Sequence, residues 1–183
     1  MDRPASPLYR LFFAVKPPII VARQIDYFAQ NIAPDAHHIG IAHQHVTLAV
    51  TADWPDYPYE RIKALRRAAI GIMADPFDLW LDRLSQGGRS AALRPSHGVD
   101  GLKRLQRQVV ETMQRAGATL RPGWAFSPHQ TLFYRDGRPD QRPIEGFGWR
   151  VEEVVLICSH VGRSRHEQVG AWPLRGSAQY RLL

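Results

Sequence analysis

Two four-residue stretches, HVTL beginning at His45 and HQTL beginning at His129, repeat the pattern His-x-Thr-Leu in the two halves of the chain. Each stretch lies in a segment with the apolar patterning of a β-strand. Because residues i and i+2 of a strand face the same side, we expect His45 to point with Thr47 and His129 to point with Thr131. If a pseudo-twofold axis relates the halves, both pairs converge on one central cleft.

The segments around these stretches have the same order in both halves: a strand leads, through a helix, to the strand that carries the histidine. We therefore predict an α+β fold for residues 1–183, a single bilobal domain of two pseudo-symmetric antiparallel β-sheets with flanking helices. The patterns predict strands over 8–15, 43–50, 77–84, 127–134, 151–158 and 169–175, helices ending near Ile32 and over 59–73 and 101–116, and a mobile loop over 136–148.

The composition is that of a globular protein with an excess of positive charge. The formal net charge is +7, from 24 Lys and Arg against 17 Asp and Glu. This charge favours polyanionic partners such as RNA, and it is equally typical of a plain arginine-rich surface. The most apolar stretch, 11–22, is interrupted by Lys16 and two prolines, which argues against a signal peptide or a membrane span. We expect a cytoplasmic monomer that does not enter the membrane, with Cys158 as a buried, inert thiol.

Paired histidine and threonine side chains suit an in-line displacement at phosphorus. One neutral imidazole can take a proton from attacking water while the other, as imidazolium, protonates the departing oxygen. The hydroxyls of Thr47 and Thr131 can hydrogen-bond the non-bridging phosphate oxygens and place the phosphate between His45 and His129. This scheme requires no metal, no cofactor and no covalent intermediate.

The two motifs and their flanks also carry a resemblance to a known family. The start, LFFAVKPP at 11–18, the approach to the second motif, FSPHQTL at 126–132, and the ending, SHVGR at 159–163 through WPL at 172–174, extend the similarity over nearly the whole chain. The sequence resembles the 2H phosphoesterase superfamily, in particular its branch of 2′-5′ RNA ligases and RNA 2′,3′-cyclic phosphodiesterases.

The resemblance implies a bilobal fold with the active site between the lobes. It implies hydrolysis of 2′,3′-cyclic phosphate ends of RNA, or of related nucleotides, to 2′-phosphates without metal or ATP, together with the reversible 2′-5′ ligation that names the family. On the family pattern, His45 protonates the leaving 3′ oxygen and His129 activates water. The motif itself is symmetric, so the reverse assignment is equally consistent with the sequence.

The chain departs from the family near the second motif. Many relatives carry a phosphate-binding arginine five residues after the second histidine, where this chain has Tyr134 and places Arg135 one residue later. We expect Arg135 to bind substrate only if the strand bulges or ends there, because a one-residue shift reverses the face of a strand. Gln130 stands where an apolar residue is usual, which predicts a less buried outer face.

Two alternatives remain open at this stage. The histidines near the first motif suggest a metal site, but no carboxylate stands at ligand spacing in that run, and His43 is better interpreted as a polar neighbour of the site. A non-catalytic RNA-binding or RNA-processing accessory module could keep the same fold, although binding alone does not need paired acid-base groups. Three further histidines, His97, His160 and His166, are expected to be exposed or structural, although His160 could approach the cleft. The aromatic residues of the strands and loops are expected to lie mostly in the core: Tyr9, Phe12, Phe13 and Trp124.

Overall fold

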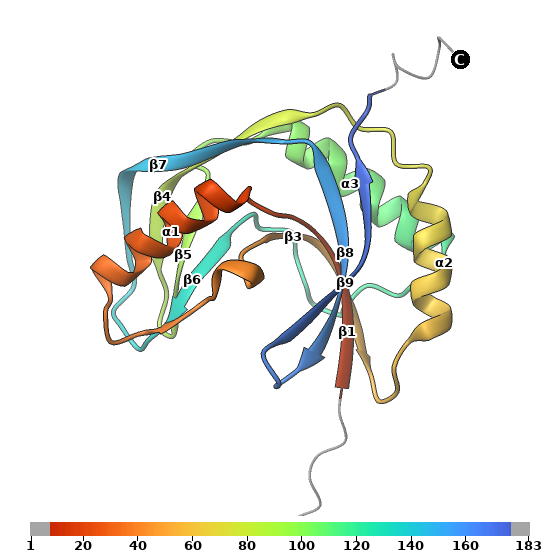
Figure 1. Cartoon of the computed structure of the whole chain (residues 1–183), viewed down its shortest axis with the longest axis horizontal. Coiled ribbons are helices and arrows are strands. Elements are labelled where there is room, and N and C mark those ends of the chain that lie inside the picture. Colours follow the sequence, from red (N-terminus) through yellow and green to blue (C-terminus); the bar gives the residue numbers. More distant parts are fainter. Residues whose placement is uncertain (1–7, 177–183) are drawn as a thin grey trace, which may run out of the picture.

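The computed structural model describes residues 8–176, which form an α+β fold of two antiparallel sheets with three α-helices (Figure 1). The four-stranded sheet has the order β3-β1-β8-β9, and the five-stranded sheet has the order β2-β6-β5-β4-β7. The predicted fold class and its two antiparallel sheets are therefore confirmed. No helix among these residues is long and apolar enough to cross a membrane.

The four-stranded sheet is built around its second strand, which is buried on both faces. Leu11, Phe13 and Val15 of this strand belong to the main hydrophobic core, whereas Phe12 and Ala14 point to the opposite face. This alternation is the two-residue period of a strand. The strands, in spatial order, are β3 (Val46–Trp54), β1 (Leu8–Val15), β8 (Glu153–Val161) and β9 (Arg165–Pro173).

The five-stranded sheet contains three strands that the sequence patterns did not predict. The segment 136–148, predicted as a loop, instead enters an edge strand that pairs with β4 from Gln86 opposite Asp140 to Phe77 opposite Val151. The outer half of this strand is exposed, so proline, glycine and arginine are tolerated there and hide it from pattern analysis. The short strand after the Gly-Gly turn and the two-residue strand at the sheet edge opposite β7 were not predicted either. The strands are β2 (His37–His38), β6 (Gln130–Tyr134), β5 (Ser90–Arg94), β4 (Phe77–Gln86) and β7 (Asp140–Val151).

The three predicted helices are present, although the one predicted over 59–73 already ends at Ala69, and they cross between the lobes. α1 (Ile19–Ile32) precedes the first motif in sequence but packs on β6 and β7 of the five-stranded sheet. α3 (Asp100–Arg115) precedes the second motif but packs on β3 of the four-stranded sheet, next to α2 (Tyr59–Ala69). Figure 1 shows α1 in one lobe and α2 with α3 in the other. This reciprocal exchange ties the two sheets together on either side of the motifs.

Both motif strands begin later than predicted. β3 starts at Val46 rather than near His43, because a short 3₁₀ turn, η1 (Ile41–His43), precedes it. β6 starts at Gln130 rather than near residue 127. Each motif histidine therefore immediately precedes its strand, at the equivalent point of its sheet.

Candidate active site

The two motif histidines are held in the same way by backbone carbonyls. His45 Nδ1 lies 2.6 Å from the carbonyl oxygen of His43, and His129 Nδ1 lies 2.7 Å from that of Ser127. A carbonyl oxygen only accepts hydrogen bonds, so each Nδ1 carries the proton of the neutral ring. In both rings Nε2 is then left with its lone pair to accept a proton, or to donate one when the ring is protonated.

Both histidines and both motif threonines line one cleft between the sheets, with a volume of about 810 Å³. His45 and Thr47 come from the four-stranded lobe, and His129 and Thr131 come from the five-stranded lobe. Seven of the eight histidines of the chain line this cleft. No aspartate or glutamate is among the residues that line it in the described part of the chain. The cleft is thus suited to an anion.

The imidazole of His45 packs against other aromatic and imidazole rings. Its ring centroid is 4.8 Å from that of Phe12 and 5.6 Å from that of His166. Burial lowers the pKa of His45 to about 4, and the nearby positive charges of Lys16 and His129 act in the same direction. The hydrogen bond to the backbone opposes this shift only in part. At neutral pH the free protein therefore holds His45 as the neutral ring.

His166, which the sequence predicts to be exposed or structural, lines the cleft. It is half-buried, and its ring lies 4.7 Å from that of His43 and 5.4 Å from that of Phe12. Burial, followed by the charges of His45 and His43, lowers the pKa of His166 to about 4. The β8–β9 register, which sets His166 opposite Ser159, brings it there. Only this long-range pairing could have revealed the position.

The other histidines divide between the cleft and the surface. His160 lines the cleft, as sequence analysis allowed, and its Nε2 lies 3.6 Å from Glu167. His43 also lines it, whereas His97 lies outside and contacts Ser96. Within residues 8–176, no group of three or more His, Cys, Asp or Glu side chains could hold a metal ion.

Arg135 does not line the cleft, contrary to its predicted substrate-binding role. Thr131 pairs with Ala92 and Phe133 pairs with Ala91, so the intervening residue of β6 forms a bulge. The extra residue reverses the parity of the strand and puts Tyr134 on the side of Thr131. Arg135 turns to the other side, where its guanidinium lies 5.5 Å from the Phe133 ring centroid and lines a separate cavity. A bulge was expected to bring Arg135 into the cleft, but the observed bulge has the opposite effect, because along an unbroken strand residue 135 would share the side of Thr131.

Behind the two motifs, the side chains of Gln44 and Gln130 meet in the core. Gln44 is 2% exposed and Gln130 is fully buried, which corrects the expectation of a less buried outer face at Gln130. Gln130 Nε2 donates to Gln44 Oε1 over 3.0 Å, and Gln44 Nε2 donates to the carbonyl oxygen of Ala22 over 3.0 Å. The pair joins residues directly adjacent to the two motif histidines, one from each lobe.

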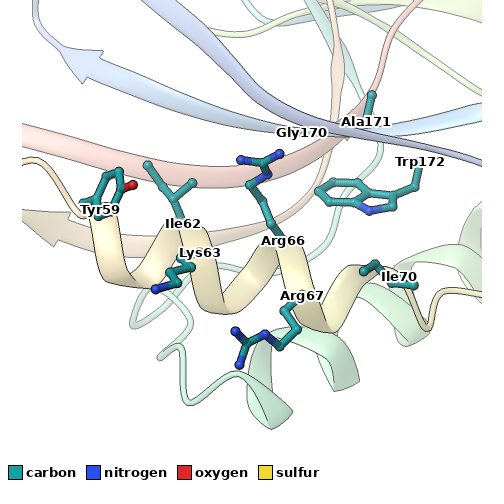
Figure 2. Close-up of a pocket in the computed structure, with 9 residues that line it drawn as sticks. All are labelled: Tyr59, Ile62, Lys63, Arg66, Arg67, Ile70, Gly170, Ala171 and Trp172. Carbon is teal, nitrogen blue, oxygen red and sulfur yellow. The ribbon is translucent and has the colours of Figure 1, made fainter.

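A second cavity, of about 480 Å³, lies between α2 and β9, away from the motifs. Figure 2 shows Arg66 of α2 beside Trp172 of β9, with Ile62 on the other side of Arg66. None of the predicted site residues lines this cavity. The motif residues for which the sequence predicts a chemical role therefore lie in the cleft between the sheets and not in this cavity.

Comparisons with known proteins agree with this arrangement. A family model described as the 2′-5′ RNA ligase superfamily matches residues 22–163. No curated protein matches. Among solved structures, Escherichia coli LigT complexed with 3′-AMP is 26% identical with a TM-score of 0.75, over 92% of this chain and 98% of LigT. A structure described as a phosphoesterase is 26% identical with a TM-score of 0.73, over 90% of this chain and 97% of the other.

The fold alone is also shared with a protein of Thermus thermophilus, TT0787, which is 21% identical with a TM-score of 0.70 over 92% of this chain and 99% of that protein. The family match covers well over half of the chain and includes both His-x-Thr-Leu motifs. The protein therefore belongs to the 2′-5′ RNA ligase superfamily of 2H phosphoesterases.

Proposed function

We propose that the protein is a metal-independent phosphodiesterase that opens 2′,3′-cyclic phosphates at the ends of RNA, or on related nucleotides, and leaves a 2′-phosphate. The observation that carries the proposal is the symmetry of the cleft. Two imidazoles present Nε2 from opposite lobes, each with a threonine hydroxyl from its own strand, in a cleft lined by no carboxylate of residues 8–176. Reversible 2′-5′ ligation, in which a 5′-hydroxyl attacks the cyclic phosphate in place of water and the 3′ oxygen again leaves, belongs to the same proposal.

The reaction divides into two proton transfers around one substitution at phosphorus. A neutral Nε2 accepts a proton from water as its oxygen forms a bond to phosphorus. The bond from phosphorus to the 3′ oxygen breaks, and the Nε2–H of the second, protonated imidazole supplies the proton of the new 3′-hydroxyl. The hydroxyls of Thr47 and Thr131 donate to the non-bridging oxygens, on which charge accumulates in the transition state.

The surroundings of the two rings support His45 as the base in the free protein. Burial among Phe12 and His166 lowers the pKa of His45 to about 4, so the ring enters the reaction neutral. His129 would then donate the proton to the leaving oxygen. This assignment is the reverse of the one that the family pattern implies, and it rests on the burial of His45 and the resulting fall in its pKa.

The relatives support a nucleotide as the substrate. The LigT structures that resemble this one hold 3′-AMP, ATP, NADP⁺ or phosphate. A nucleotide phosphate seated between His45 and His129 would have the aromatic ring of Phe12 and the arginines of the cleft within the same cavity.

The test is hydrolysis of a nucleoside 2′,3′-cyclic phosphate in the presence of a chelator, with the product phosphate located by NMR. Removing either imidazole, in His45→Ala or His129→Ala, should lower kcat by roughly 10²–10⁴. His97→Ala is the matched control, because His97 is the one histidine outside the cleft. Turnover that requires a divalent ion and survives the loss of either cleft histidine would refute the scheme. RNA binding without turnover of any cyclic phosphate would instead favour an accessory module.

A substrate with a better leaving group separates the two histidine roles. A nitrophenyl phosphodiester needs little protonation of its leaving oxygen, so it should restore activity to the variant that lacks the acid and not to the one that lacks the base. We expect recovery in His129→Ala and none in His45→Ala. Recovery in His45→Ala alone would return the assignment to the family pattern.

A further inference from the structure

The floor of the cleft continues beyond the motif residues along β1. On β1, Arg10 lies opposite Asp53 and Phe12 lies opposite Val50. Thr47 pairs with the residue of β1 that is four positions after Arg10. At about 3.3 Å per residue, Arg10 and Thr47 are separated by about 13 Å along the strand. Both belong to the same cleft. The cleft is therefore longer than one phosphate needs.

At this far end two arginines share one carboxylate, and we call Arg10, Asp53 and Arg121 the arginine clasp. Arg10 holds both oxygens of Asp53, with Nε at 2.6 Å and Nη2 at 2.9 Å, and Arg121 Nη1 lies 3.1 Å from the same carboxylate. The Arg10 guanidinium, followed by that of Arg121, keeps the pKa of Asp53 below its usual value. Two cations against one anion leave the arginine clasp with a net positive charge.

Arg121 is the member that can reach a ligand. Its backbone N–H donates to the carbonyl oxygen of Val50 over 2.9 Å, which fixes its Cα against β3. Its side chain is 40% exposed and bonds Asp53 through Nη1. Arg10 forms a bidentate pair with Asp53 and so fixes this carboxylate, which in turn orients Arg121. A guanidinium fixed in this way is suited to bind a phosphate through its remaining N–H groups.

Between the arginine clasp and the motif residues the floor is apolar and aromatic. Phe12 and Val50 form a small buried cluster with β8, and Trp124 packs against it at the surface of the cleft. Aromatic rings accept any nucleobase by stacking. The cleft thus has, in order, a phosphate site with two imidazoles, an aromatic section and a cationic end.

We propose that the arginine clasp binds a second phosphate of the substrate, on the 5′ side of the cyclic phosphate. This inference rests on the proposed function. A 2′,3′-cyclic phosphate terminates its strand, so every other phosphate of an RNA lies on its 5′ side. The cleft therefore selects RNA ends and 5′-phosphorylated nucleotides over nucleosides that carry the cyclic phosphate alone. In this chain the selection is made from β1 and the loop after α3, because β6 presents Tyr134 where relatives present an arginine.

The test compares kcat/KM for three substrates: a nucleoside 2′,3′-cyclic phosphate, the same compound with a 5′-phosphate, and a dinucleotide with the cyclic end. We expect about a tenfold gain in kcat/KM for each of the two substrates that carry one further phosphate on the 5′ side, the effect of one charged hydrogen-bonding partner. In Arg121→Gln the ratio between substrates should fall below two. It should also fall in the unmodified protein as salt concentration rises. Equal values for all three substrates, or an equal loss for all three in Arg121→Gln, would overturn the proposal.

Arg150→Gln is the matched control. Arg150 also pairs with one aspartate, Asp78 at 3.5 Å, but lies outside the cleft, so the substrate ratio should remain that of the unmodified protein. Binding separates this proposal from the proposed function. Calorimetry should show adenosine 3′,5′-bisphosphate binding about tenfold more tightly than 3′-AMP, with the difference lost in Arg121→Gln. Equal binding refutes the arginine clasp even if cyclic phosphates are hydrolysed, and the predicted difference supports it even if they are not.

Discussion

The hydrogen bond between Gln44 and Gln130 connects the two lobes immediately behind the motif histidines. Replacing Gln130 with leucine removes the donor and keeps a side chain of similar size in the core. The change leaves Gln44 Oε1 buried without its partner, because Gln130 Nε2 supplies that bond at 3.0 Å. An unpaired buried acceptor costs about 1–3 kcal/mol.

The loss of stability in Gln130→Leu is reduced by the other polar atom of the Gln130 side chain. Within the described residues, Gln130 Oε1 is itself buried with no hydrogen-bond partner, so its removal relieves one desolvation penalty. We therefore expect Gln130→Leu to lower the free energy of unfolding by about 1–2 kcal/mol. Gln44→Leu should cost more, because it leaves Gln130 Nε2 without a partner while Gln130 Oε1 stays buried and unpaired, and it also removes the bond from Gln44 to the carbonyl oxygen of Ala22.

Urea unfolding of the two single variants and the double variant measures the pair directly. The double variant removes both amides together, so its loss should be smaller than the sum of the single losses by about 1–3 kcal/mol. The m-value should not change, since the surface exposed on unfolding is nearly the same. Additive losses, or a Gln130→Leu variant as stable as the unmodified protein, would refute the view that this bond joins the lobes.

The same variant should also affect catalysis if the pair fixes the separation of the two imidazoles. Small displacements of reacting groups are costly, and a shift of about 1 Å can reduce a rate 10²-fold. We expect kcat of Gln130→Leu to fall at least about tenfold while KM changes little, because Thr47 and Thr131 still hold the phosphate. A larger effect on KM than on kcat would place the role of the pair in binding instead.

Other predictions concern stability and reactivity. Burial lowers the pKa of His45 and of His166 to about 4, so these side chains take up protons at higher pH in the unfolded chain than in the folded protein. The free energy of unfolding should therefore fall as the pH decreases from 6.5 to 4, by on the order of 2 kcal/mol for His45, and urea midpoints measured across this range would show it. Gly101→Ala should lower the melting temperature despite the helix propensity of alanine, because its Cβ would collide with Phe77. Cys158 should resist alkylation in the native protein and react after unfolding, because it is buried and burial raises its pKa to about 11.

Much of the fold could be predicted because its signals are local. The two-residue alternation of β1 and the helical spacing of α1 and α3 are properties of single segments, and the structure confirms them. β7 was missed for the opposite reason. Its identity as a strand comes from its pairing with β4, and as an exposed edge strand it needs no apolar pattern of its own.

In the candidate site, too, some features follow from local sequence patterns and others depend on long-range contacts. The side-by-side placement of histidine and threonine follows from strand geometry, and the sequence therefore indicates it. His166, Arg10 and Arg121 reach the cleft through strand pairings and a loop that no local pattern specifies. The Gln44–Gln130 bond joins residues 86 positions apart, so only the packed lobes reveal it.

The bulge in β6 decides which residue near the second motif faces the cleft. Parity along a regular strand would leave Tyr134 on the outer face and bring Arg135 to the side of Thr131, yet the pairing of Thr131 with Ala92 and Phe133 with Ala91 reverses both positions. The five-stranded lobe then offers the cleft an aromatic ring in place of a guanidinium. The proposed phosphodiesterase needs a fixed cation to hold a second phosphate, and under our proposal Arg121 of the four-stranded lobe supplies it. The departure from the family pattern at one strand and the arginine clasp on the other are, on this argument, two parts of one change in substrate recognition.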